Sequence, residues 1–73
     1  MTARGIEIRT KLLELGKTQR DLVAELRNRG VLASASDLSK ALKAPYYPRE
    51  INMVSVAYEI CLEWEAQAKR KKK

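Results

Sequence analysis

The sequence predicts an all-α fold: a small bundle of four to five helices with a helix-turn-helix and a long C-terminal helix. Three observations support this prediction. Phe is absent and aromatic residues make up only 5% of the chain, which disfavours a sheet-rich fold. Apolar residues recur at helical spacing between breaks marked by Gly or Pro. Two of these breaks are followed by helix-capping residues. The chain of 73 residues is the size of one small domain.

The first helix is expected over residues 3–15. Its apolar side chains recur at helical spacing; Ile8, Leu12 and Leu15 form the main stripe, and Ile6 and Leu13 lie on a neighbouring side. Gly16 follows as a natural C-terminal stop, because glycine readily adopts the left-handed conformation that ends a helix.

Two helix starts follow, and each places a hydroxyl three residues before a carboxylate. The pairs are Thr18 with Asp21 and Ser34 with Asp37. In such a capping box, the hydroxyl accepts from the third backbone N–H and the carboxylate accepts from the N–H of the capping residue. Two capped helices joined by a turn that contains Gly indicate a helix-turn-helix.

The first helix of this pair is expected to bury Leu22, Val23 and Leu26, and Gly30 is expected to end it. The apolar residues 31–33 are short enough to tuck under the bundle.

The second helix of the pair has two contrasting sides. The apolar side consists of Ala35, Leu38, Ala41 and Leu42, and the opposite side consists of Ser36, Ser39, Lys40 and Lys43. Short hydroxyl side chains and cations can contact base edges and phosphates in a major groove without repelling the DNA backbone. The pattern therefore favours a DNA-reading helix over residues 34–43, although an ordinary solvated surface would look similar.

A break with two prolines separates this helix from the last one. Pro45 is expected to end the reading helix, and Pro48 suits the first turn of the next. The intervening Tyr46 and Tyr47 are expected to cover the edge of the core. Alternatively Tyr46, Tyr47 or Arg49 donates to phosphate beside the reading helix.

The last helix, over residues 48–69, is apolar around about two-thirds of its circumference, more than a surface helix needs. One apolar side carries Ile51, Val54, Tyr58, Cys61 and Leu62. The second carries Met53, Val56, Ala57, Ile60 and Trp64. We expect the second side to be a homodimer interface. The alternative is that this helix runs through the middle of the bundle and is covered all round.

The net charge of +6 is concentrated at the C-terminus, because residues 69–73 supply five of these charges. This basic tail is expected to be disordered and to follow a domain formed by residues 1–68. Residues 1–47 hold nine cations and five acids, whereas Glu59, Glu63 and Glu65 lie later. Such an asymmetry fits a DNA-facing side and an opposite side.

These motifs resemble the lambda-repressor/Cro-like helix-turn-helix (XRE-type) proteins of phages and mobile elements. The matching segments are LLELGK at residues 12–17, TQRDLVAEL at 18–26, GV at 30–31 and DLSKAL at 37–42. The resemblance implies that Gln19 touches a DNA phosphate and that residues 34–43 form the reading helix. The turn over residues 27–33 is longer than the family's usual one.

Other functional classes find little support. The chain has one Cys and no His, which argues against a disulfide, a metal site and a nucleophile–base pair. We therefore expect no enzyme activity, no cofactor and no small-molecule substrate. With no membrane-spanning run and no signal peptide, the expected location is the cytoplasm, in association with the nucleoid.

The expected function is a sequence-specific, repressor-like regulator that binds double-stranded DNA. The alternative is a protein-interaction module on the same scaffold, like an antirepressor or antitoxin. The expected DNA contacts are Thr18, Gln19, Arg20, Ser34, Ser36, Ser39, Lys40, Lys43, Tyr46 and Arg49.

Overall fold

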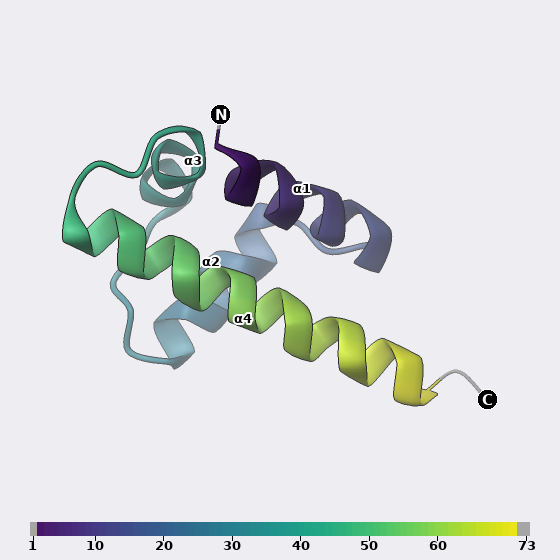
Figure 1. The fold of residues 1–73 in the computed structure, drawn as a ribbon. Helices are drawn as coiled ribbons and strands as arrows, with labels where there is room; N and C mark the ends of the chain where they lie inside the picture. Colours follow the sequence, from purple (N-terminus) through teal and green to yellow (C-terminus); the bar gives the residue numbers. More distant parts are fainter. Residues whose placement is uncertain (1, 72–73) are drawn as a thin grey trace.

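The computed structural model describes residues 2–71, and for residues 70 and 71 it describes the backbone alone. Four helices follow one another in this part of the chain (Figure 1): α1 (Ala3–Leu15), α2 (Gln19–Asn28), α3 (Ala35–Lys43) and α4 (Pro48–Lys71). No strand occurs among the described residues, so the predicted all-α bundle is confirmed. None of the helices in residues 2–71 has the length and apolar character needed to cross a membrane.

The helix ends lie where the capping residues predict them. Thr18 and Ser34 each form a complete capping box, with Asp21 and Asp37 respectively. Gly16 ends α1 with a φ of 70°, and Gly30 follows α2 with a φ of 83°. Both values lie in the left-handed region, which a residue with a Cβ adopts only at a cost. These local signals therefore set the boundaries of the first three helices.

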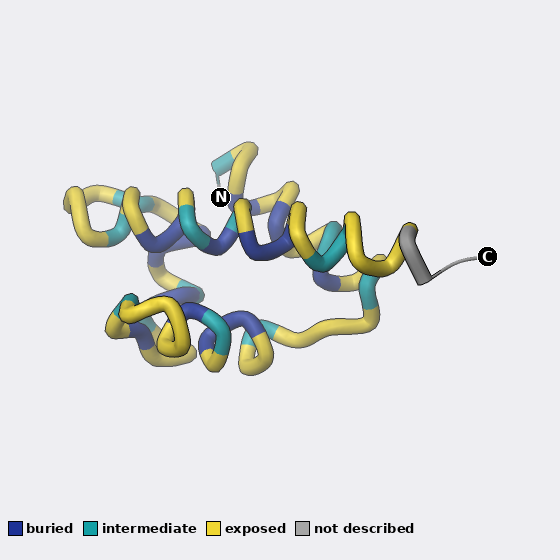
Figure 2. Tube along the Cα trace, turned by 90° about the horizontal axis from the view of Figure 1, so that it is seen from below, coloured by how far each residue is buried: buried dark blue, intermediate teal, exposed yellow. Residues whose placement is uncertain are grey.

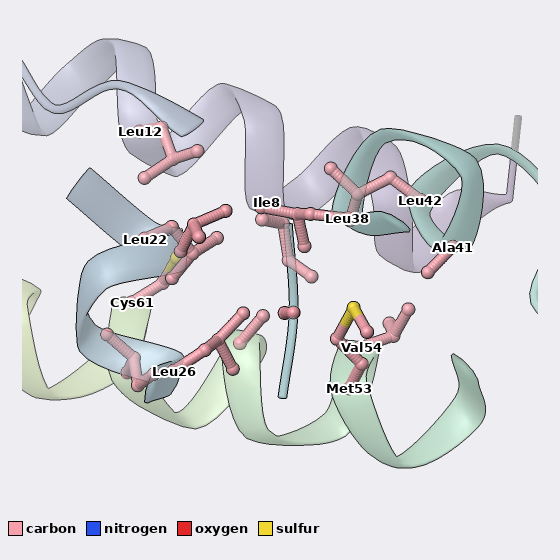
Figure 3. Close-up of a cluster of buried hydrophobic side chains, with 14 residues drawn as sticks. Ile8, Leu12, Leu22, Leu26, Leu38, Ala41, Leu42, Met53, Val54 and Cys61 are labelled. Atoms are coloured by element: carbon pink, nitrogen blue, oxygen red, sulfur yellow. The ribbon is translucent and has the colours of Figure 1, made fainter. Parts of the chain in front are cut away.

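α4 crosses the whole molecule and packs against the other three helices, while α1 and α2 both also contact α3 (Figure 1). The buried positions of the helices face one another, and the exposed positions lie on the outside (Figure 2). The core takes side chains from every helix (Figure 3). Its largest fully buried members are Ile8, Leu22, Leu26, Leu38, Leu42, Met53, Ile60 and Cys61.

The expected homodimer interface on α4 is wrong for its central residues. Met53, Ala57 and Ile60 are buried within the protomer, and Val56 and Trp64 are partly buried against the same core. α4 buries residues of both apolar sides against α1, α2 and α3, but it is not covered all round as the alternative expected. The exposed strip of α4 carries Ile51 and Leu62 from the side expected to be core.

Other apolar residues also lie outside the core. Ile6 and Leu13 are exposed on α1, so the neighbouring side of that helix does not pack. In the connection between α2 and α3, Ala33 is buried as expected, but the Leu32 side chain is 86% exposed. Only part of this connection therefore tucks under the bundle.

α1 crosses the C-terminal end of α3 at a buried glycine. A Cβ built on Gly5 would overlap the backbone carbonyl oxygen of Leu42. Beside it, the Thr2 hydroxyl accepts from the N–H of Gly5 at 3.1 Å and caps α1. The same hydroxyl lies 3.4 Å from the Leu42 carbonyl, to which it donates. These contacts fix the start of α1 against α3.

Charge pairs hold the second half of α4 against the rest of the bundle. The Arg29 guanidinium binds Glu63 at 2.6 Å and Glu25 at 3.1 Å, and the Lys11 ammonium binds Glu65 at 3.1 Å. These bonds lower the pKa of Glu63 and raise the pKa values of Lys11 and Arg29. Two of the three acidic residues of α4 that were expected to form an acidic side, Glu63 and Glu65, are thus paired with cations outside α4. Glu59 alone of the three remains outside these ion pairs.

Candidate nucleic-acid interface

The outward face of α3 carries the four side chains that the sequence assigns to it. Ser36, Lys40 and Lys43 are exposed and Ser39 is half-buried. Together with Ala35 they line one shallow, open hollow, and no carboxylate is among its lining residues. Leu38, Ala41 and Leu42 anchor the opposite face in the core, whereas Ala35 is exposed and does not join them as expected.

The two ammonium groups of this face are available to an outside partner. The ion pairs in the described part of the chain involve the cations Arg4, Lys11 and Arg29. Lys40 and Lys43 take part in none of them. Both lie in the last turn of α3, where a cation is favoured by the helix dipole. The face therefore presents hydroxyl groups and unpaired positive charge.

Ser34 is placed to cap α3 rather than to reach outward. Its hydroxyl accepts from the N–H of Asp37 at 3.2 Å, and the Asp37 carboxylate accepts from the N–H of Ser34 at 3.3 Å. The N-terminus of α3 thus already holds an anionic group. Sequence reasoning assigned Ser34 both a capping and a DNA-contacting role, and the geometry accounts for the first.

At the start of α2, Thr18 and Gln19 line a separate hollow together with Arg9, Lys17 and the side chains of Leu12 and Leu13. The N–H and the hydroxyl of Thr18 both donate to the Asp21 carboxylate, at 2.9 and 3.1 Å. These bonds lower the pKa of Asp21. Because its donors are used internally, Thr18 acts as a cap.

Gln19 and Arg20 differ from Thr18, since neither side chain forms a hydrogen bond within residues 2–69, the part of the chain whose side chains the structure describes. Gln19 is half-buried and Arg20 is exposed. No residue of the α2 hollow also lines the α3 hollow. The structure therefore gathers the α3 residues into one site and leaves Thr18, Gln19 and Arg20 as a second group.

A third hollow adjoins the α3 face and shares Lys40 with it. Its other lining residues are Asp37, Tyr47, Arg49 and Glu50. Tyr46 and Tyr47 are 83% and 68% exposed, so the interpretation that they cover the edge of the core is wrong. Both lie in the connection between α3 and α4, and the alternative of a phosphate contact stays a prediction.

Glu50 is a residue of this region that sequence reasoning missed. One of its carboxylate oxygens accepts from the backbone N–H groups of Tyr46, at 2.9 Å, and Tyr47, at 3.1 Å. These two bonds, followed by the charges of Lys40 and Arg49, hold the pKa of Glu50 below its usual value. A signal was present in the sequence: Glu50 is the third residue of a helix that begins with Pro48, the position from which Glu caps a helix start.

Cys61 offers no chemistry at this interface. It is fully buried in the core, and burial raises the pKa of its thiol to about 11. The described residues contain no cluster of side chains able to hold a metal ion.

No family model matches this chain, and no match was found among curated proteins or among solved structures. Its function is therefore inferred from the geometry of the α3 face and its surroundings.

Proposed function

We propose that this protein binds double-stranded DNA sequence-specifically and acts as a repressor-like transcriptional regulator, with α3 in the major groove. The observation that carries the proposal is the outward face of α3. Its hydroxyl groups and unpaired ammonium groups lie together, with no carboxylate among them to repel a phosphate backbone. A rigid helix anchored by Leu38 and Leu42 can present such a face to base edges.

The residues divide into two roles. Ser36, Ser39 and Lys40 precede Lys43 along the face and are assigned to base edges. Lys43, Gln19 and Arg20 are assigned to phosphates, which set the register of the protein on the duplex without reading sequence. Tyr46 and Arg49 flank the same side and are assigned to phosphate as well.

A homodimer is part of this proposal, through a surface other than the buried side of α4. Two-fold symmetry would place two α3 helices on one duplex and would favour an inverted repeat. The half-sites would lie about one helical turn apart, roughly 34 Å from centre to centre. Association with the nucleoid is part of the same proposal, and the phage or mobile-element context is proposed from the family resemblance of the sequence alone.

The test is selection of bound sequences from a random duplex pool at near-physiological salt, followed by titration of any enriched site. Lys40→Ala should weaken binding by about 1–3 kcal/mol and relax the preference at one base pair. Lys69→Ala is the matched control, because Lys69 is also an exposed lysine and lies on the last turns of α4. It should leave the base preference unchanged.

Leu13 and Leu32, at 82% and 86% exposure, favour a second candidate function, the protein-interaction module. Exposed leucines of this kind suit a protein partner better than a phosphate backbone. The DNA-binding proposal fails if no motif is enriched and a double Ser36→Ala, Lys40→Ala variant binds duplex as weakly as the unmodified protein. That result would favour the interaction module.

A further inference from the structure

We propose that Glu50 determines the sequence discrimination of the α3 site by restraining the attraction of Lys40 and Arg49 for phosphate. The inference rests on the proposed DNA-binding function and adds a residue that contacts no base. Its basis is the hollow between α3 and the start of α4, where Asp37, Lys40, Tyr47, Arg49 and Glu50 come together.

The position of Glu50 is fixed by the backbone rather than by other side chains. Its carboxylate accepts from two consecutive N–H groups, those of Tyr46 and Tyr47, at 2.9 and 3.1 Å. The N–H of Ile51 also donates to the Tyr47 carbonyl at 3.0 Å, which starts α4 at this point. The carboxylate is therefore held in one place, and the connection that carries both tyrosines is held with it.

The charge at this place affects the cations next to it. Lys40 lies in both the α3 hollow and the Glu50 hollow. Arg49 precedes Glu50 in the first turn of α4 and is exposed. Neither cation is used up by an ion pair in the described residues, so both remain able to bind DNA, but each does so in the field of a fixed negative charge.

A fixed negative charge next to the reading face weakens binding to every phosphate, whatever the sequence. Affinity for non-specific DNA comes almost wholly from phosphate contacts, whereas affinity for a specific site also includes contacts with base edges. At the selected site Lys40 is assigned to a base edge, whereas on random DNA it has no matching base edge and binds phosphate instead. The charge of Glu50 therefore opposes one more phosphate contact in the non-specific complex than in the specific one. Specificity is a difference of affinities, and a repulsive element of this kind increases it.

Glu50→Gln isolates the charge, because a glutamine oxygen can still accept from the two N–H groups. We expect this variant to bind random duplex several-fold more tightly, with a salt dependence steeper by about 0.9 for each further phosphate that the protein neutralises. Affinity for the selected site should rise less, so the ratio of specific to random affinity should fall. The thermal unfolding midpoint, measured by circular dichroism, should change little.

Glu59→Gln is the matched control, because this substitution changes the net charge by the same amount. Glu59 is exposed on α4 and forms no ion pair in the described residues. This variant should raise both affinities only slightly and leave their ratio unchanged. Glu50→Ala removes the hydrogen bonds as well, and it should lower the unfolding midpoint and the affinity for the selected site.

Two outcomes overturn the inference alone. One is an unchanged affinity ratio in Glu50→Gln while the unmodified protein does discriminate between sequences. The other is an equal fall of the ratio in Glu50→Gln and Glu59→Gln, which would assign the effect to net charge. Absence of any sequence preference in the unmodified protein is a different result, and it overturns the proposed function together with this inference.

Discussion

Gly5 allows the backbones of α1 and α3 to touch, because it has no side chain at the crossing point. The sequence shows a glycine inside a helical pattern, and such a glycine lowers helix stability relative to alanine by about 1 kcal/mol. Nothing in the pattern identifies the Leu42 carbonyl as its neighbour, since that contact joins residues far apart in the chain. The position of α3 relative to α1 therefore depends on a residue that sequence reasoning passes over.

Gly5→Ala should destabilise the protein, although alanine is the better helix former. Its methyl group would overlap a backbone oxygen, which cannot rotate away as a side chain can. Overpacking of this kind typically costs about 1–3 kcal/mol, more than the gain in helix propensity. Urea unfolding monitored by circular dichroism measures the change, with exposed Thr10→Ala as the control on the same helix. An unchanged or higher midpoint for Gly5→Ala would contradict the close approach.

At the scale of the helices, local chemistry was predictable, and so was the burial of Leu22, Val23 and Leu26 on α2, but the surroundings of α4 were not. The capping boxes at Thr18 and Ser34 and the stop at Gly16 depend on residues within four positions of each other, so the sequence contains them entirely. Whether Ile60 faces a second copy of the protein or the core depends on how many helices pack against α4. The apolar periodicity of α4 shows which residues share a side, but not which helices cover that side. The α3 face was predictable because its two sides differ in chemistry.

The attachment of α4 to the bundle should weaken slightly in acid through Glu63. The Arg29 bond lowers the pKa of Glu63 in the folded state, so the stabilisation is complete above the unfolded value of about 4.3. This stabilisation is lost as the pH falls through the lower pKa that Glu63 has in the folded protein. The side chain of Glu63 is half exposed, so solvent screening limits the effect.

Glu63→Gln tests this linkage. The variant should melt at a lower temperature than the unmodified protein at pH 7 and should show a weaker dependence of the midpoint on pH as the solution is acidified through the carboxylate range. The two proteins should converge in acid. Parallel curves over the whole range, recorded by circular dichroism, would exclude a contribution from this pair. Glu59→Gln, which removes an exposed acid from the same helix, should follow the unmodified protein.

Over the described part of the molecule, the proposed reading face and the last turns of α4 lie at opposite ends. α3 lies beside the start of α4, and the last described turns of α4 lie at the other end of that helix (Figure 1). A helix from Pro48 to Lys71 spans about 35 Å at 1.5 Å per residue. The backbone of residues 69–71 continues α4, which differs from the disorder expected for the tail from residue 69 onward. Residues 72–73 lie outside the described residues, and the role expected for the tail stays a prediction.

Cutting the chain after Ala68 should weaken binding to selected and random duplexes by similar factors and should flatten the salt dependence. The reason is that a run of five cations binds phosphates without reading bases. Titrations of both duplexes at several salt concentrations measure this, and circular dichroism of the shortened chain checks that it folds. A loss confined to the selected duplex would mean that the tail reads sequence.

The position of Trp64 gives the two ends of the molecule different intrinsic fluorescence signals. It is the only tryptophan, it is half-buried, and the Lys17 ammonium lies 5.1 Å from the centre of its ring. It lies about 24 Å along α4 from Pro48. Tyr46 and Tyr47 lie exposed near the opposite end. Indole emission therefore reports whether the far half of α4 is docked. Two of the three phenols, those of Tyr46 and Tyr47, are exposed to whatever covers α3, whereas Tyr58 packs against the core. The unlabelled protein thus carries separate optical reporters of folding and of ligand contact.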